Sequence, residues 1–276
     1  MISINNLYFN YQKTKVFKGL NITFEKGKIY GLLGENGVGK TTLLKLICGL
    51  QKPTKGSCIV DNFIPFDRNP NFLNNIFFIP DEIVGYNGTS EKYSRNLGLF
   101  YPNYDHEYFI KICHDFEIDP TKNYKTMSFG QQKKAIIASA LALKTEYLFL
   151  DEPTNGLDIP SKASLRKILA NYCDEKTTLI ISTHQVKDVE NLLDNIIILD
   201  NEGVILAADT VSIASKLFFS YDQEMRGDAL YSEMLPGGYI NVIPNDNNEE
   251  SNINIEALFN TAHKNKELIK NIFNNI

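Results

Sequence analysis

The stretch Gly34-Glu35-Asn36-Gly37-Val38-Gly39-Lys40-Thr41 decides the fold of this chain. It fits the pattern G-x-x-x-x-G-K-[ST], in which glycines let backbone N–H groups turn inward around a phosphate. Lys40 adds a positive charge beside the phosphates, and the Thr41 hydroxyl is a potential magnesium ligand. Apolar residues at 28–33 predict a strand before the loop, and the spacing at 42–48 predicts a helix after it. The alternative, a chance glycine-rich turn, does not explain this register.

A second segment, Tyr147-Leu148-Phe149-Leu150-Asp151-Glu152, predicts a buried strand that ends in two acids. Open α/β sheets hold their ligands at the carboxyl ends of such strands. We therefore expect Asp151 to hold Mg²⁺ through water, and Glu152 to orient or deprotonate an attacking water. An apolar run followed by an acid is often only a strand end, so this prediction depends on the neighbouring motifs.

The order of these motifs resembles that of the ATP-binding-cassette (ABC) ATPases, from about residue 2 to about residue 210. In chain order, the motifs are the phosphate loop (Walker A) at 34–41, a signature segment at 127–132, Walker B at 148–151 followed by Glu152, Pro153-Thr154-Asn155-Gly156-Leu157-Asp158, and Ser182-Thr183-His184. The resemblance implies that the protein binds ATP with Mg²⁺ and hydrolyses it.

The resemblance also implies the fold class, an α/β phosphate-loop NTPase core with a mainly parallel sheet. We expect an N-terminal antiparallel β subdomain and an inserted helical subdomain at about 85–140, the cassette spanning 1–210. Residues 211–276 then form a small α+β C-terminal extension. Within it, the sequence predicts a short helix over 211–235, a strand at 237–243 and a helix from Ile255 onward.

The resemblance assigns most nucleotide contacts to one end of the cassette. Tyr11 is expected to stack on adenine, because an aromatic ring can pack flat on a purine, and Tyr8 is the competing candidate. The remaining expected ATP contacts in this region are Gly34, Asn36, Gly37, Gly39, Lys40, Thr41 and Thr42. Thr41 and Asp151 are the expected metal ligands.

In this family two cassettes pack head to tail, so a second copy completes each site. Ser128, Gly130 and Gln131 would contact the γ-phosphate held by the partner copy, since a helix N-terminus attracts a phosphate. Ser128 is equally an ordinary N-cap residue, and the two roles are compatible. Asp158 matches the family's D-loop at the dimer seam, with a solvated loop acid as the alternative. His184 matches the switch histidine, which bonds the γ-phosphate and holds the attacking water in line with Glu152.

Three positions depart from the family pattern. Most members carry a glutamine that ligates Mg²⁺ where this chain has Asp81. A carboxylate also reaches magnesium, so Asp81 is a third metal candidate, and an acidic surface loop is the alternative. The signature has Met127 in place of Leu and Phe129 in place of Gly, and neither change removes the Ser128 or Gly130 contact.

The composition of the chain argues against several other classes of protein. The 276 residues carry a net charge of −5, which gives no broad basic surface for nucleic acid. The four cysteines stand singly, as expected for reduced thiols rather than a zinc site or a disulfide framework. No apolar stretch reaches the roughly 18 residues of a membrane span, and no signal peptide is predicted.

We therefore predict that the chain is an ATPase subunit that forms a homodimer of cassettes. The homodimer is expected to energise a separate transmembrane permease subunit from the cytoplasmic face of the cell membrane. The C-terminal extension is similar to those of single-cassette bacterial exporters, so we expect export. The alternative is a soluble cassette ATPase that does mechanical work elsewhere. A phosphate-loop kinase is disfavoured by the signature segment and His184.

Overall fold

The computed structural model describes residues 1–83 and 85–273. Its centre is a six-stranded sheet with the order β5-β6-β7-β3-β8-β9. The strands are β3 (Ile29–Leu33), β5 (Ile76–Ile79), β6 (Tyr147–Asp151), β7 (Thr178–Thr183), β8 (Asn195–Asp200) and β9 (Gly203–Asp209). All pair in parallel except β9, which runs antiparallel to β8. The predicted mainly parallel sheet is confirmed.

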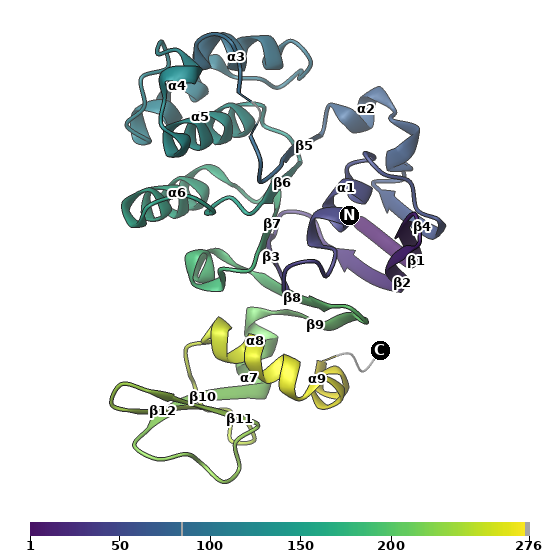
Figure 1. The fold of residues 1–276 in the computed structure, drawn as a ribbon, viewed down its shortest axis with the longest axis vertical. Helices are drawn as coiled ribbons and strands as arrows, with labels where there is room; N and C mark the ends of the chain where they lie inside the picture. The colour runs from purple at the N-terminus through teal and green to yellow at the C-terminus, as the bar shows by residue number, and fades with distance from the viewer. Residues whose placement is uncertain (84, 274–276) are drawn as a thin grey trace.

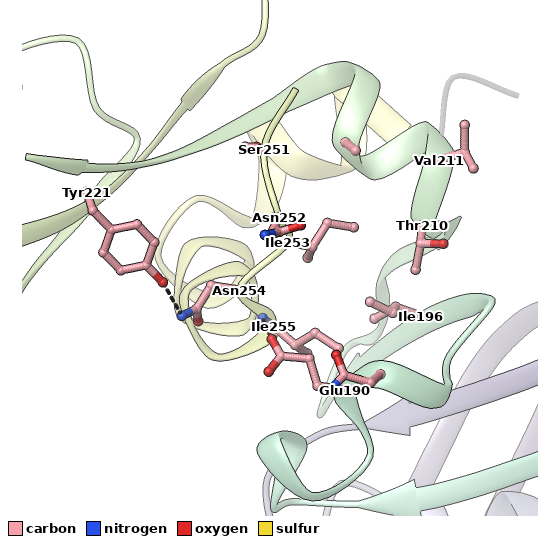
Figure 2. A pocket seen from close by; sticks show the side chains of 12 residues that line it. Glu190, Ile196, Thr210, Val211, Tyr221, Ser251, Asn252, Ile253, Asn254 and Ile255 are labelled. Carbon is pink, nitrogen blue, oxygen red and sulfur yellow. Dashed lines mark hydrogen bonds between the residues drawn. The ribbon is translucent and has the colours of Figure 1, made fainter. Parts of the chain in front are cut away.

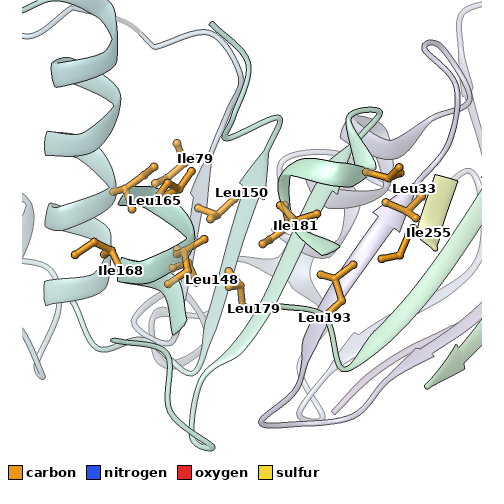
Figure 3. Close-up of a cluster of buried hydrophobic side chains, with 14 of the residues drawn as sticks. Leu33, Ile79, Leu148, Leu150, Leu165, Ile168, Leu179, Ile181, Leu193 and Ile255 are labelled. Atoms are coloured by element: carbon orange, nitrogen blue, oxygen red, sulfur yellow. The ribbon is translucent and has the colours of Figure 1, made fainter. Parts of the chain in front are cut away.

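Alternate residues of the central strands face two separate hydrophobic cores. Leu148 and Leu150 pack on the face covered by α6 (Ile159–Tyr172), where Leu165 and Ile168 meet them, as Figure 3 shows. Phe149 lies in the core on the opposite face. Because successive side chains of a strand point to opposite faces, a sheet covered on both sides needs such a continuous apolar run.

The second face is covered by the helix that follows the phosphate loop and by an antiparallel sheet (Figure 1). That helix is α1 (Lys40–Ile47), and the sheet has the order β2-β1-β4. Its strands are β1 (Ile2–Tyr11), β2 (Thr14–Phe24) and β4 (Lys55–Val60). The predicted N-terminal antiparallel subdomain is present, and it places α1 between two sheets.

A group of helices inserted between β5 and β6 packs at one end of the central sheet (Figure 1). It contains α3 (Ser90–Gly98), α4 (His106–Asp115) and α5 (Phe129–Ala142), the inserted helices that the resemblance implied. Short elements fill the connections: η1 (Pro65–Asp67), α2 (Pro70–Leu73), η2 (Tyr124–Thr126), η3 (Val186–Asp188) and η4 (Glu190–Leu192). None of the helices in the described part of the chain is both long enough and apolar enough to cross a membrane.

The C-terminal segment corrects one sequence prediction. Only α7 (Thr210–Lys216) is helical in the stretch expected to be a helix, and the chain continues as β10 (Leu217–Asp222) and β11 (Tyr231–Leu235). With β12 (Gly238–Pro244) they form an antiparallel sheet of order β10-β12-β11. Strand β12 was predicted, and pairing with it explains the result, since the aromatic residues at 218–221 suit a strand.

Two final helices, α8 (Ile255–Lys264) and α9 (Lys266–Phe273), fold back toward the cassette. Figure 2 shows the segment 251–255 lining a cleft of about 700 Å³ between the two parts. There the Ile255 backbone N–H donates to Glu190 Oε1 at 2.9 Å. Asn254 Nδ2 donates to the Tyr221 hydroxyl at 3.2 Å, which anchors the start of α8.

Candidate functional site

The phosphate loop leaves β3 at Leu33 and enters α1 at Lys40. Gly37 and Gly39 have φ values of +89° and +109°, a conformation that L side chains rarely adopt. At Gly34 an added Cβ would lie 2.7 Å from the Leu199 carbonyl oxygen, so the loop also needs glycine for space. The glycines predicted from the sequence therefore build a tight turn over the start of α1.

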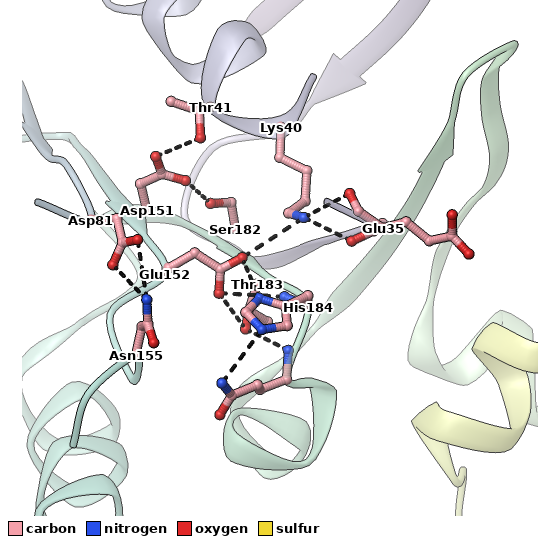
Figure 4. A network of polar contacts seen from close by, with 12 residues as sticks. Glu35, Lys40, Thr41, Asp81, Asp151, Glu152, Asn155, Ser182, Thr183 and His184 are labelled. Carbon is pink, nitrogen blue, oxygen red and sulfur yellow. Dashed lines mark hydrogen bonds and ion pairs between the residues drawn. The ribbon is translucent and has the colours of Figure 1, made fainter. Parts of the chain in front are cut away.

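Lys40 is almost fully buried at the base of this loop. Its Nζ donates to the carbonyl oxygens of Gly34 at 2.7 Å and Glu35 at 3.2 Å. It also lies 3.7 Å from Glu152 Oε1 (Figure 4). Burial lowers the pKa of Lys40, and the charges of Glu152 and Asp151 oppose that shift. A phosphate would give this ammonium stronger partners than two carbonyl oxygens.

Strand register brings the two Walker segments together. Asp151 pairs with Ser182 across β6 and β7, so both lie at the carboxyl edge of the sheet beside the loop. The Thr41 hydroxyl donates to Asp151 Oδ2 at 2.7 Å, and the Ser182 hydroxyl donates to Oδ1. Thr41 and Asp151 thus place two hard oxygen ligands side by side, which fits Mg²⁺ shared with a phosphate chain.

Thr41 and Asp151 offer a metal only two protein ligands at this edge. Among the described residues, no group of three or more His, Cys, Asp or Glu side chains is arranged to hold a metal by itself. Magnesium at nucleotide sites uses one or two protein ligands and completes its shell with phosphates and water. A site built from one hydroxyl and one carboxylate belongs to that kind.

Glu152 and His184 face each other at the same edge. Nδ1 of His184 lies 2.8 Å from Oε1 of Glu152, and the Thr183 hydroxyl donates to Oε2 at 3.1 Å. The His184 backbone N–H reaches Oε2 at 3.4 Å. The predicted base and switch histidine are therefore brought into direct contact, with the carboxylate held on both oxygens (Figure 4).

Asp81 has partners that the sequence analysis did not foresee. Asn155 Nδ2 lies 3.2 Å from both carboxylate oxygens of Asp81 (Figure 4), and Lys133 Nζ lies 3.6 Å from Oδ1. Asp81 is therefore tied to the segment after Glu152 rather than to Thr41 and Asp151. Its predicted role as a metal ligand stays a prediction, since it requires Asp81 to leave these contacts.

The signature segment begins a helix, as expected. Ser128 is the N-cap of α5, and its hydroxyl accepts from the Gln131 backbone N–H at 3.3 Å. In return, the Ser128 backbone N–H donates to Gln131 Oε1 at 3.1 Å. This capping box confirms the structural role of Ser128. The Phe129 ring fills the space beside Gly156, where an added Cβ would come within 2.7 Å of the ring.

The remaining predicted contacts lie on three different elements. Tyr11 ends β1 with an exposed ring, which makes a T-shaped contact with Phe9 at 4.8 Å between the ring centroids. Asp158 is the N-cap of α6 and accepts from the Ser161 backbone N–H at 2.9 Å. Thr42 is buried in the first turn of α1.

Sequence reasoning missed three residues of this site. Ser182 and Thr183 were quoted only as part of a motif, although their position one strand over from Asp151 predicts that they reach the carboxylates. Lys133 was not singled out. Its sequence neighbours, Gln132 and Lys134, are polar, so no local signal marks this lysine as buried.

Known proteins that are similar to this chain support the same family. The family described as ABC transporter matches residues 17–155. The ABC transporter ATP-binding protein YtrB of Bacillus subtilis is 29% identical over 211 residues, covering 76% of this chain and 72% of the relative. The cobalt import ATP-binding protein CbiO of Salmonella typhimurium is 30% identical over 220 residues, covering 75% of this chain and 79% of the relative.

A solved structure gives the same picture. CbiO1 from Clostridium perfringens, part of the ABC transporter complex cbiONQ, superimposes with a TM-score of 0.65 and 27% identity. The match covers 77% of this chain and 89% of that one. The chain therefore belongs to the ABC transporter family, as one of its ATP-binding and ATP-hydrolysing subunits.

Proposed function

We propose that this chain, in the presence of Mg²⁺, hydrolyses ATP between two copies of itself and thereby drives a separate membrane subunit. The observation that carries the proposal is the convergence of one lysine and two side-chain pairs at one edge of the central sheet. Lys40 lies in the phosphate loop, Thr41 meets Asp151, and His184 meets Glu152. The positive charge, the metal ligands and the base therefore lie close enough together to act on one bound triphosphate.

The residues divide the chemistry among them. Lys40 and the loop hold the β- and γ-phosphates, while Thr41 and Asp151 hold the metal. Magnesium, when bound, neutralises phosphate charge and stabilises the charge that develops during transfer. Glu152 orients the attacking water and accepts its proton. His184 donates to the terminal phosphate and keeps the water aligned with Glu152.

Two copies are proposed because the signature residues lie on a helix apart from the phosphate loop. Ser128 caps α5 in the inserted helical group, and α1 lies on the far side of the central sheet (Figure 1). Next to the capped end, Phe129 and Ile159 are exposed by 46% and 82%. Large exposed apolar side chains beside a phosphate-binding helix end suit a surface that closes on a second copy.

A membrane partner is proposed from an apolar cleft between the core and the helical group. The cleft has a volume of about 520 Å³, and Phe100 and Leu50 stand exposed on it. Its other linings are mainly apolar, among them Leu73, Ile76, Phe77, Phe78, Leu97 and Tyr101. Relatives are ATP-binding subunits of transporters, so we assign this cleft to a cytoplasmic segment of a membrane subunit.

That assignment places the chain at the inner face of the cell membrane. The direction of transport stays a prediction, because the relative CbiO is named as a cobalt import protein and gives the expected export no support. The relatives also do not favour the alternative of a soluble ATPase doing mechanical work. The division into a cassette at 1–210 and an extension at 211–276 is likewise kept as a proposal.

The test uses tagged chain recovered from detergent-solubilised membranes of its own organism. We expect a multi-span membrane protein to be recovered with it, and Phe100→Asp to reduce that recovery while leaving ATP hydrolysis by the isolated chain unchanged. Leu268→Asp, an exposed residue on α9, is the matched control. Equal recovery with both variants would remove the assignment of the cleft, and absence of Mg²⁺-dependent hydrolysis would overturn the function itself.

A further inference from the structure

Lys133 is a charged residue with no exposed surface. It lies in the early part of α5, five residues after the N-cap Ser128, and its side chain is 0% exposed. A lysine is almost never fully buried unless its ammonium group has partners. The site chemistry described above does not use this residue.

Three partners surround the ammonium group. Nζ donates to the backbone carbonyl oxygens of Glu152 at 2.7 Å and Asn155 at 3.0 Å. The Oδ1 atom of Asp81 lies 3.6 Å away. A lysine has three N–H donors, so two are committed to carbonyl oxygens and the charge is balanced by one carboxylate. The lysine thus joins the signature helix, the segment after Walker B and the Asp81 loop.

The bond to Glu152 restrains an unusual backbone. Glu152 has a φ of +47°, a conformation that residues with a Cβ seldom adopt and that surrounding contacts must maintain. Its N–H donates to the Ser182 carbonyl at 2.9 Å, and its carbonyl accepts from Lys133. Both peptide groups of Glu152 are therefore held, and with them the direction in which its side chain leaves the chain.

We propose that Lys133 is a positioning residue for ATP hydrolysis, which holds the backbone of Glu152 and couples it to Asp81. The inference rests on the proposed function, since it takes Glu152 as the residue that orients the water. When Asp81 moves, the ammonium loses its nearest carboxylate, and Lys133, which donates to the Glu152 carbonyl, is held less firmly. Changes at Asp81 then alter the hydrolysis step rather than ATP binding.

A purely structural lysine would behave differently. If Lys133 only filled the core, its loss would lower stability and leave the turnover of the folded protein unchanged. A positioning role separates kcat from KM, because Lys133 lies against the Glu152 backbone while the phosphates are held by Lys40 and the loop. The neutral amide of Lys133→Gln keeps N–H donors without the charge, so it tests the hydrogen bonds apart from the ion pair.

The experiment measures ATP turnover and ATP affinity of the full chain at saturating Mg²⁺. Lys133→Met is expected to lower kcat at least tenfold with the Kd for ATP within twofold, and Lys133→Gln to restore part of the loss. Lys125→Met, an exposed lysine just before the signature segment, is the matched control. A kcat for Lys133→Met within twofold of this control would overturn the proposal. If that variant does not fold, the proposal is overturned by wild-type turnover in Lys133→Gln together with an undiminished effect of Asp81→Asn in that background.

Coupling to Asp81 is measured with a double-mutant cycle. Asp81→Asn alone is expected to lower kcat, and it should have less than half that effect, as a ratio, in the Lys133→Gln background. Strictly multiplicative effects would contradict the coupling. Glu152→Gln distinguishes failure of the Lys133 proposal from failure of the proposed function. If Glu152→Gln stops turnover while the Lys133 variants do not, only the role of Lys133 is refuted. If Glu152→Gln leaves turnover intact, the proposed function is refuted.

Discussion

His184 and Glu152 form a hydrogen-bonded pair, with Nδ1 of the histidine 2.8 Å from Oε1 of the glutamate. The glutamate side chain is 11% exposed and the histidine side chain 36% exposed. The carboxylate is therefore the more buried member of the pair and the imidazole the more exposed one. A histidine in this position can contact the terminal phosphate while it keeps the carboxylate fixed.

From this pair we expect His184→Ala to lower kcat by about 10²-fold, the usual effect of removing one preorganised donor from a transition state. The Kd for ATP should change by less than about threefold, because Lys40 and the phosphate loop remain. Steady-state kinetics with equilibrium binding of ATP measure both. His114→Ala, whose side chain is 89% exposed on α4, is the control. Equal turnover in the two variants would remove His184 from the mechanism.

Lys40→Ala should act on binding itself. The variant removes a buried ammonium that now bonds two loop carbonyls, and a charge-assisted contact to phosphate is lost with it. We expect the Kd for ATP to rise at least tenfold in isothermal titration. Lys45→Ala, in the last turn of the same helix, should bind like the unchanged chain. Unaltered affinity in Lys40→Ala would count against the phosphate loop as assigned.

Magnesium dependence separates the two aspartates. Asp151→Asn removes a carboxylate that already accepts from Thr41, so the Mg²⁺ concentration for half-maximal turnover should rise about tenfold or more. Asp81→Asn should raise it less, because Asn155 and Lys133 hold that carboxylate away from the pair. The measurement is a Mg²⁺ titration of turnover at fixed ATP. No shift for Asp81→Asn would end its role as a metal ligand and leave its contacts with Asn155 and Lys133.

A stability prediction concerns the C-terminal helices. Asp200 at the end of β8 is paired with Lys266 at the start of α9 and accepts from the Glu202 and Gly203 backbone N–H groups. Burial alone would raise the pKa of Asp200, but Lys266 and these hydrogen bonds hold it below the usual 3.8. Asp200→Asn should therefore reduce the free energy of unfolding at pH 7 by about 1–2 kcal/mol.

The sign of the pH dependence follows from that lowered pKa. The ionised carboxylate contributes its full stability above about pH 3.8, and the contribution is lost as the pH falls through the lower pKa of the folded state. Urea unfolding at pH 7 and at successively lower pH should show the wild-type advantage shrinking only below about pH 4. An advantage that is constant down to pH 3 would show that the Asp200 charge is not its source.

Much of the fold and site could be predicted because the informative residues are close in sequence. The loop at 34–41 needs its glycines for local backbone geometry, and an unbroken apolar run predicts the strand that ends at Asp151. Both signals depend on neighbouring residues only. The fold class and the family followed from the order of such local motifs, and the comparisons confirm them.

The sequence predictions that were wrong or missing concern contacts between residues that are far apart in the chain. The helix predicted over 211–235 breaks at Leu217, because pairing of β10 with β12 outweighs a short helical pattern. Lys133 was overlooked because its partners are backbone carbonyls at 152 and 155, and backbone groups leave no trace in a sequence pattern. The contact of Asp81 with Asn155 likewise joins residues 74 positions apart.

The proposed ATP hydrolysis depends most directly on ATP-driven pairing of two copies. Multi-angle light scattering of purified Glu152→Gln, with and without Mg²⁺ and ATP, measures it, and Glu107→Gln, an exposed residue on α4, is the control. We predict that Glu152→Gln binds ATP, no longer turns it over, and doubles its mass when ATP is present. A variant that stays monomeric with ATP even when the membrane subunit is supplied, or that hydrolyses ATP near the wild-type rate, would contradict the account.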